Sequence, residues 1–278
     1  MIRSIATVTL GGTLPEKLDA IAAAGFRYVE LVSSDLDGFD GTARDVKELA
    51  DSYGLRILAY QPFRDFEGRP RHEFGHHVDR ARTAIETTRT LGADLLLVCS
   101  AVVPDAVGDD DIRTADLRVL AGLGADAEVR IGYEALSWGK FASRSRDAWA
   151  LVERVDHPNF GLVLDTFHSL AIDEELSFLD AVPVERIFLI QVADAPYLEA
   201  EIIQWSRHHR CLPGEGSFDL EAFLSIPIRN GYSGPLSLEV FSDQLTAGAP
   251  APVAINAYRS LCKLEYDCRN LLRSGLAW

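Results

Sequence analysis

The sequence predicts an α/β fold, a single (β/α)8 TIM barrel over residues 1–278. Short β-rich runs alternate eight times with segments of helical spacing, which is the pattern of a closed parallel barrel. The chain has 278 residues, 47% of them hydrophobic, and barrels of about 250 residues commonly form one domain. One barrel therefore accounts for this sequence without a second domain.

The expected strands begin with the run SIATVTL near the N-terminus and recur along the whole sequence. They lie at 4–10, 27–32, 55–60, 94–99, 129–135, 159–165, 186–192 and 235–240. The stretches between them carry apolar residues on one helical face, first at Leu14, Leu18, Ile21 and Ala22. The acidic run at 108–111 fits a solvated loop that caps the following helix.

Four of the expected strands end in a carboxylate or amide side chain: Glu134, Asp165, Gln191 and Glu239. Chemistry in such barrels takes place where strands end and loops begin, so these groups are expected to converge. Their oxygen atoms suit a hard divalent ion such as Mg²⁺, Mn²⁺ or Co²⁺ better than a thiolate-bound zinc. Any one of them alone fits a helix cap or a pair with arginine equally well. Together, in the same register, they predict a metal site.

The segment 205–210, WSRHHR, concentrates two arginines, a hydroxyl and two histidines in an acidic chain. A guanidinium matches a carboxylate through two hydrogen bonds, so Arg207 or Arg210 is a candidate anchor for an anionic substrate. The alternative is a loop of surface salt bridges. His168 follows Asp165 by three residues and would stand near the ion, where an imidazole can serve as general base.

Charge and hydropathy restrict the partners that we expect. The net charge of −15 disfavours non-specific nucleic-acid binding. No apolar run approaches the roughly 20 residues of a membrane span, and the start lacks the apolar region of a signal peptide, so we expect a cytoplasmic protein without a membrane partner. The cysteines Cys99, Cys211, Cys262 and Cys268 show no CxxC pair and are expected to be reduced, with Cys268 in the core.

Three further motifs carry less weight. The match to HExxH at 72–76 contains a glycine and begins in an expected loop, which favours a loop and helix start over a zinc protease. The stretch DLDGFDG at 35–41 lacks the spacing of a calcium loop and is expected to form a turn. The phrase PGEG at 213–216 fits either an anion-binding loop or a simple turn.

Across nearly its whole length the sequence resembles bacterial 3-dehydroshikimate dehydratases, which belong to the sugar phosphate isomerase/epimerase-like (xylose isomerase-like) metal-dependent TIM barrels. The resemblance is carried by YQPFRDFEG at 60–68, LLLVCS at 95–100, GYEALSWG at 132–139, LVLDTFHSLA at 162–171, QVADAP at 191–196, WSRHHRCLPGEG at 205–216 and GPLSLEVF at 234–241. The polar strand ends are shared by the wider superfamily. The phrases around 60–68 and 205–216 are the more specific evidence.

The resemblance implies dehydration of 3-dehydroshikimate to protocatechuate with a divalent metal ion. It implies Glu134, Asp165, Gln191 and Glu239 as metal ligands and His168 as the base, with Arg64, Arg69, Ser206 and Arg210 near a small anionic polyhydroxy carboxylate. Many members of that family continue into a C-terminal dioxygenase-like domain, whereas this sequence stops at Trp278, which leaves a homo-oligomer open.

Three other functions have different requirements. A sugar or sugar-phosphate isomerase or epimerase of the same fold would use Glu134 and Glu239 themselves to move protons on opposite faces of the substrate. An endonuclease-type phosphodiesterase would require several histidine ligands and a basic groove. A barrel kept only as a binding scaffold would not need four convergent ligands.

Overall fold

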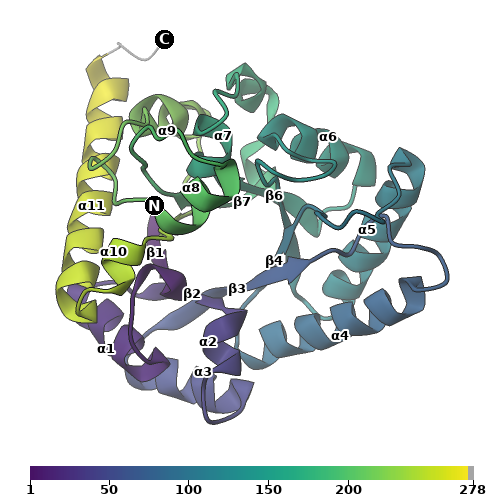
Figure 1. The fold of residues 1–278 in the computed structure, drawn as a ribbon, viewed down its shortest axis with the longest axis horizontal. Coiled ribbons are helices and arrows are strands. Elements are labelled where there is room, and N and C mark those ends of the chain that lie inside the picture. The colour runs from purple at the N-terminus through teal and green to yellow at the C-terminus, as the bar shows by residue number, and fades with distance from the viewer. Residues whose placement is uncertain (275–278) are drawn as a thin grey trace.

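The computed structural model describes residues 1–274, which form a closed barrel of eight parallel strands surrounded by helices, as the sequence predicts (Figure 1). The strands are β1 Ile2–Ala6, β2 Tyr28–Val32, β3 Arg56–Arg64, β4 Leu95–Cys99, β5 Arg130–Glu134, β6 Phe160–Asp165, β7 Ile187–Val192 and β8 Pro235–Leu238. Each strand pairs with the next, and β8 pairs with β1. The barrel is therefore closed.

The helices lie outside this barrel and in the loops at its carboxyl end. They are α1 Leu14–Ala24, α2 Ser33–Asp37, α3 Ala43–Ser52, α4 Phe74–Thr90, α5 Asp110–Asp126, α6 Ser145–Val155, α7 Thr166–Leu170, α8 Ile202–His208, α9 Leu220–Arg229, α10 Asp243–Thr246 and α11 Pro250–Ser274. Three short 3₁₀ helices are η1 Thr7–Thr9, η2 Ser177–Ala181 and η3 Val184–Arg186. No helix within residues 1–274 is both long and apolar enough to cross a membrane.

The first strand differs from its expected range, because β1 ends at Ala6 and the chain turns into η1. The threonine side chains of η1 explain the difference. Thr7 Oγ1 accepts a hydrogen bond from the backbone of Val32 at 3.2 Å, and Thr9 Oγ1 accepts one from Val240 at 3.1 Å. These side chains hydrogen-bond the ends of the neighbouring strands in place of a continued backbone ladder.

The third strand is longer than expected. β3 continues to Arg64, where Phe63 pairs with Val98 and Arg64 with Cys99. This extension places Gln61 level with Val32 at the carboxyl end of β2, and Arg64 level with Cys99 at the carboxyl end of β4. It therefore adds two polar side chains to the mouth of the barrel.

Apolar side chains fill both the space between strands and helices and the inside of the barrel. The inner cluster includes Leu95, Leu97, Val163 and Leu189. Gly161 faces Phe188 so closely that a Cβ atom there would lie 2.6 Å from the ring. The inner core therefore requires a glycine at this position. Beyond this apolar layer, toward the carboxyl ends of the strands, the barrel interior becomes polar.

The long helix α11 packs against α1 and α9 on the outside. Cys268 is fully buried in the same core as Leu261 and Leu264, which confirms its expected place. All four cysteines have free thiols.

Candidate active site

The mouth of the barrel at the carboxyl ends of the strands holds a small polar pocket. It is lined by Gln61, Arg64, Cys99, Glu134, Leu136, Trp138, His168, Arg207, Arg210, Glu239 and Phe241. These residues come from β3, β4 and β5, from the short helices α7 and α8, and from the loops that follow β5, α8 and β8. Each βα unit brings at most a few side chains, and closure of the barrel brings them together.

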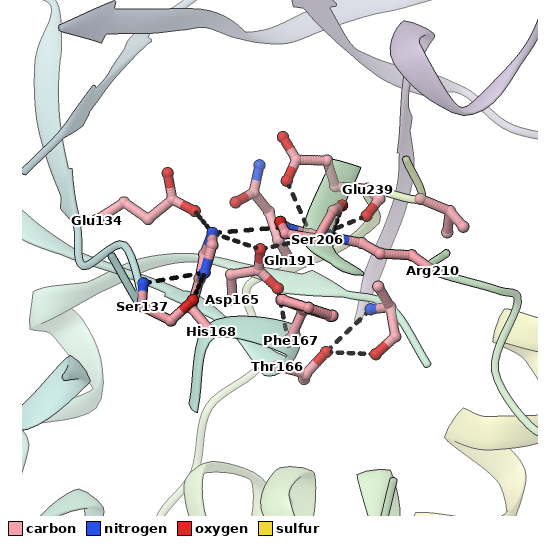
Figure 2. Close-up of polar contacts among 12 residues, drawn as sticks. Glu134, Ser137, Asp165, Thr166, Phe167, His168, Gln191, Ser206, Arg210 and Glu239 are labelled. Carbon is pink, nitrogen blue, oxygen red and sulfur yellow. Dashed lines mark hydrogen bonds and ion pairs between the residues drawn. The ribbon is translucent and has the colours of Figure 1, made fainter. Parts of the chain in front are cut away.

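Glu134 and Asp165 are the last residues of β5 and β6, and His168 stands in the short helix α7 directly after β6 (Figure 2). All three side chains are buried. His168 Nε2 lies 3.8 Å from Glu134 Oε1 and 3.6 Å from Asp165 Oδ2. One ligand atom from each residue falls within 4.8 Å of the others, which is close enough for a shared metal ion.

Gln191 and Glu239 complete the predicted set from the next two strands. Gln191 pairs in register with Asp165 of β6, and Glu239 directly follows β8. The Oε1 atom of Gln191 is buried and has no hydrogen-bond partner among residues 1–274. A buried acceptor without a partner is costly, and a bound ion or water would satisfy it. The oxygen donors present here therefore fit a hard divalent ion.

Arg210 lies inside this acidic cluster and is almost completely buried. Its Nη1 donates to Asp165 Oδ2 at 2.7 Å and lies 3.4 Å from Glu239 Oε2. Its Nη2 donates to Ser206 Oγ at 2.9 Å and lies 3.4 Å from His168 Nε2 (Figure 2). The guanidinium is thus occupied by protein groups, and the Ser206 hydroxyl faces Arg210.

Burial and crowding of like charges shift the acid–base equilibria of the cluster. Burial, followed by the charges of Glu239 and Asp165, raises the pKa of Glu134 well above its usual value. Burial also raises the pKa of Asp165 to about 6, although Arg210 opposes the shift. The pKa of His168 is lowered well below 6.5 by burial and then by Arg210, Arg207 and Arg64. The imidazole is therefore neutral, and the carboxylates require a further positive charge to be ionised together.

Ser137, in the loop after β5, contacts the other ring nitrogen of His168. Nδ1 lies 3.0 Å from Ser137 Oγ and 3.2 Å from its backbone nitrogen. The hydroxyl can accept a hydrogen bond from Nδ1–H, which leaves a lone pair on Nε2, while the backbone N–H favours the opposite tautomer. In either case the contact fixes the ring, so that Nε2 faces the carboxylates.

Two arginines at the rim differ from Arg210 in their contacts with the protein. Within residues 1–274, neither Arg64 nor Arg207 makes a side-chain hydrogen bond or ion pair. The Arg207 guanidinium lies over the rings of Phe241 and Trp138, at 4.8 and 5.6 Å from their centroids. Burial and then repulsion from Arg64 lower the pKa of Arg207. Two neighbouring cations, one of them held on aromatic rings, are suited to an anionic ligand.

Arg69 stands apart from the pocket. Its guanidinium donates to Asp105 at 2.7 Å, to Glu73 at 3.1 Å and to His77 at 3.1 Å. It does not line the mouth pocket in the described chain. The structure therefore brings together the other residues expected at the site but places Arg69 in a polar cluster of the β3–α4 loop.

The three weaker motifs have structural explanations. Helix α4 starts at Phe74, so His72 and Glu73 precede it, and His72 is 80% exposed. The backbone N–H groups of Gly214 and Gly216 both donate to Asp194 at 3.0 Å, so the PGEG loop holds an internal carboxylate. The DLDGFDG stretch contains the end of α2 and a turn.

Glu30 and Gln61, both buried in the polar interior, were not among the predicted site residues. Glu30 Oε2 accepts hydrogen bonds from Gln61 at 3.2 Å and from Gln191 at 3.0 Å. The rule that identified the four predicted ligands applies here too, since Glu30 lies near the end of an expected strand and Gln61 directly follows another.

Known proteins resemble this chain over almost its whole length. Residues 18–263 match the family model described as xylose isomerase-like TIM barrel. A 3-dehydroshikimate dehydratase of Pseudomonas aeruginosa is 49% identical over 273 residues, covering 98% of this chain and 43% of that protein. The 3-dehydroshikimate dehydratase of Pseudomonas putida is 45% identical over 269 residues, covering 97% of this chain and 42% of that protein.

A solved structure, described as a xylose isomerase-like TIM barrel/4-hydroxyphenylpyruvate dioxygenase fusion protein, has the same fold. It superimposes with a TM-score of 0.96 at 44% identity, covering 100% of this chain and 44% of that chain. The present chain thus spans less than half the length of these relatives.

Proposed function

Because the chain belongs to the xylose isomerase-like TIM barrel family, we propose that it is a metal-dependent lyase that dehydrates 3-dehydroshikimate to protocatechuate. The proposal is supported by the similarity to the two Pseudomonas dehydratases over almost all of this chain. Within the site, the main support is the position of Arg64 and Arg207. Both line the pocket beside buried carboxylates, and neither guanidinium makes a hydrogen bond or ion pair within residues 1–274.

The metal ion would be held by the oxygen atoms of Glu134, Asp165, Gln191 and Glu239. Their number and hardness suit Mn²⁺, Mg²⁺ or Co²⁺. His168 Nε2 is close enough to be an alternative ligand, since it clusters with Glu134 and Asp165. A divalent ion at this position supplies positive charge beside a substrate ketone, which acidifies the neighbouring C–H group.

The protein groups divide the remaining tasks. Arg64 and Arg207 bind the ring carboxylate, while Trp138 and Phe241 cover the substrate and limit access of water. His168 takes the proton from the carbon next to the ketone through Nε2, held in place by Ser137. The C–O bond to the hydroxyl on the adjacent carbon then breaks, water leaves, and tautomerisation gives the aromatic ring.

An isomerase or epimerase is the second candidate within the fold, with Glu134 and Glu239 as the proton-transferring pair. Its form with an uncharged sugar is less well supported here, because such a substrate would leave Arg64 and Arg207 without a counter-ion, whereas the phosphate of a sugar phosphate could pair with them. Small-molecule chemistry at the barrel mouth is common to both proposals.

The reaction itself is the deciding experiment. Purified protein would be stripped of metal, reloaded with Mn²⁺, Mg²⁺ or Co²⁺ and given 3-dehydroshikimate, while the aromatic absorbance of the product is followed. We expect absorbance to grow with at least one ion and to stop on chelation. No aromatic product with any of the three ions, together with isomerisation or epimerisation of an uncharged ketose, would overturn the proposal.

A further inference from the structure

Glu30 is a fully buried carboxylate on β2, a strand that supplies none of the proposed metal ligands. Among residues 1–274, no lysine, arginine or histidine side chain hydrogen-bonds or pairs with it. A carboxyl group buried in a barrel interior without a cation is costly whether or not it is protonated, and an apolar residue could pack there instead. Its presence therefore requires a compensating role.

The hydrogen bonds of Glu30 lead directly to two of the proposed ligands. Its Oε2 accepts from Gln191 Nε2 at 3.0 Å and from Gln61 Nε2 at 3.2 Å. Gln61 Nε2 also donates to Glu239 Oε1 at 2.8 Å. One oxygen atom of Glu30 thus contacts Gln191 directly and Glu239 through a single amide.

These contacts decide which atom each ligand turns toward the metal site. The amide of Gln191 has a donor end and an acceptor end, and only the NH₂ end can approach Glu30 favourably. The Oε1 end is thereby fixed away from Glu30, where it is buried without a partner. In the same way, Gln61 donates to Oε1 of Glu239, and the other oxygen, Oε2, lies toward Arg210.

We infer that Glu30 is a positioning residue of the metal site, which aligns Gln191 directly and Glu239 through Gln61. This inference rests on the metal ligation in the proposed function. Residues of β2 and β3 would then orient the metal ligands that come from β7 and from the end of β8. Groups that orient metal ligands typically contribute 10- to 100-fold to metal affinity.

The test compares three variants for Co²⁺ binding, by calorimetry and by the visible absorption of the bound ion. Glu30→Leu keeps the volume but removes the acceptor, so it should weaken Co²⁺ binding about 10- to 100-fold and alter the absorption bands. Glu30→Gln keeps an acceptor oxygen and should bind within a few-fold of the wild type with similar bands. Glu265→Gln is the control. Glu265 is a buried carboxylate of α11 that pairs with Arg3 of β1, so its replacement should leave both the Co²⁺ affinity and the absorption bands unchanged.

Two results would overturn the inference. In the first, folded Glu30→Leu has the affinity and spectrum of the wild type. In the second, Glu30→Gln is as defective as Glu30→Leu, which would make charge, rather than a positioned acceptor, the important property. If Glu30→Leu does not fold, Glu30→Ala takes its place with the same two criteria.

The wild type and a Glu134→Ala/Glu239→Ala variant separate this inference from the proposed function. If the wild type binds no Co²⁺, or the double variant retains stoichiometric Co²⁺, the proposed metal site itself fails. If the wild type binds Co²⁺, the double variant does not, and Glu30→Leu equals the wild type, only the role of Glu30 is disproved.

Discussion

The guanidinium of Arg210 and the carboxylate of Asp165 form a buried ion pair inside the proposed metal site, with Nη1 2.7 Å from Oδ2. The same nitrogen lies 3.4 Å from Glu239 Oε2, so one fixed cation bridges two carboxylates from different strands. Arg210 therefore offsets part of the negative charge that the cluster carries before any ion is bound. Arg210 is buried among the proposed ligands and pairs with them, whereas Arg207 lies at the rim without an ion pair within residues 1–274.

Replacing Arg210 should destabilise the metal-free protein more than it weakens substrate binding. Arg210→Ala leaves Asp165 and Glu239 buried without their cation, a loss that costs about 3–5 kcal/mol. Urea unfolding in the presence of a chelator measures this cost, and added Mn²⁺ should recover part of it. Arg154→Ala, which breaks exposed pairs with Asp110 and Asp111, is the control and should cost at most about 1 kcal/mol. Equal stability of the two variants would contradict the bridging role.

Mutation of His168 should lower activity without removing the metal ion. His168→Ala should lower kcat by about 10²- to 10⁴-fold, the usual range for a general base, while the metal content of the protein stays that of the wild type. Metal analysis of the purified variant, together with steady-state kinetics, checks both parts. Loss of the ion along with activity would instead identify His168 as a ligand, in line with its position 3.6 Å from Asp165.

Ser137→Ala tests the positioning of His168 by the same two measurements, kcat and metal content. It removes the hydroxyl that lies 3.0 Å from His168 Nδ1 but keeps the backbone contact. We expect a smaller fall in kcat than for His168→Ala and no change in metal content.

Arg207 and Arg69 should differ sharply as substrate-binding residues. Arg207→Ala removes a half-buried cation without a protein partner, and the loss of a desolvated charged pair costs about 2–5 kcal/mol, or roughly 30-fold or more in KM. Arg69→Ala breaks ion pairs with Glu73 and Asp105, whose side chains are 41% and 55% exposed, so KM should change little. Steady-state kinetics with 3-dehydroshikimate measure both. Equal effects on KM would show that the carboxylate is bound elsewhere.

The sequence predicted the barrel well because each βα unit carries its own local signal. Polar residues at the ends of apolar strands, such as Asp165, stand out against runs that are otherwise fully buried. Strand limits were less predictable where side chains replace backbone pairing, as Thr7 and Thr9 do after β1. The place of Arg210 could not be predicted either, because spacing from Arg207 does not reveal which of two arginines in one segment points inward.

The roles of Glu30 and Gln61 depend on closure of the barrel. They lie 161 and 130 positions from Gln191 in the sequence, and only pairing across β1 and β8 brings all three to one interior. Local patterns contain no information about such a contact. Arg69 shows the converse: the family resemblance implied a place near the substrate, whereas nearby acidic side chains hold it in the loop.

Glu67 should make folding stability depend on pH independently of the metal site. It is fully buried, accepts hydrogen bonds from Tyr133 and from the backbone of Ala101 at 2.8 Å each, and burial raises its pKa to about 7 from 4.5. A carboxyl whose pKa is raised by folding is most favourable when protonated, so its contribution is complete below about pH 4.5 and is lost as pH rises through about 7.

The expected loss is up to about 3 kcal/mol, since each pKa unit corresponds to about 1.4 kcal/mol. Glu67→Gln stays neutral and keeps an acceptor oxygen for Tyr133 and Ala101, so its own contribution should not change with pH. Urea unfolding of both proteins in chelator, at pH 5, 6, 7 and 8, gives the difference in unfolding free energy, from which other titrating groups cancel. That difference should shift in favour of Glu67→Gln as pH rises. A difference that is constant from pH 5 to pH 8 would mean that Glu67 does not titrate in the folded protein over this range.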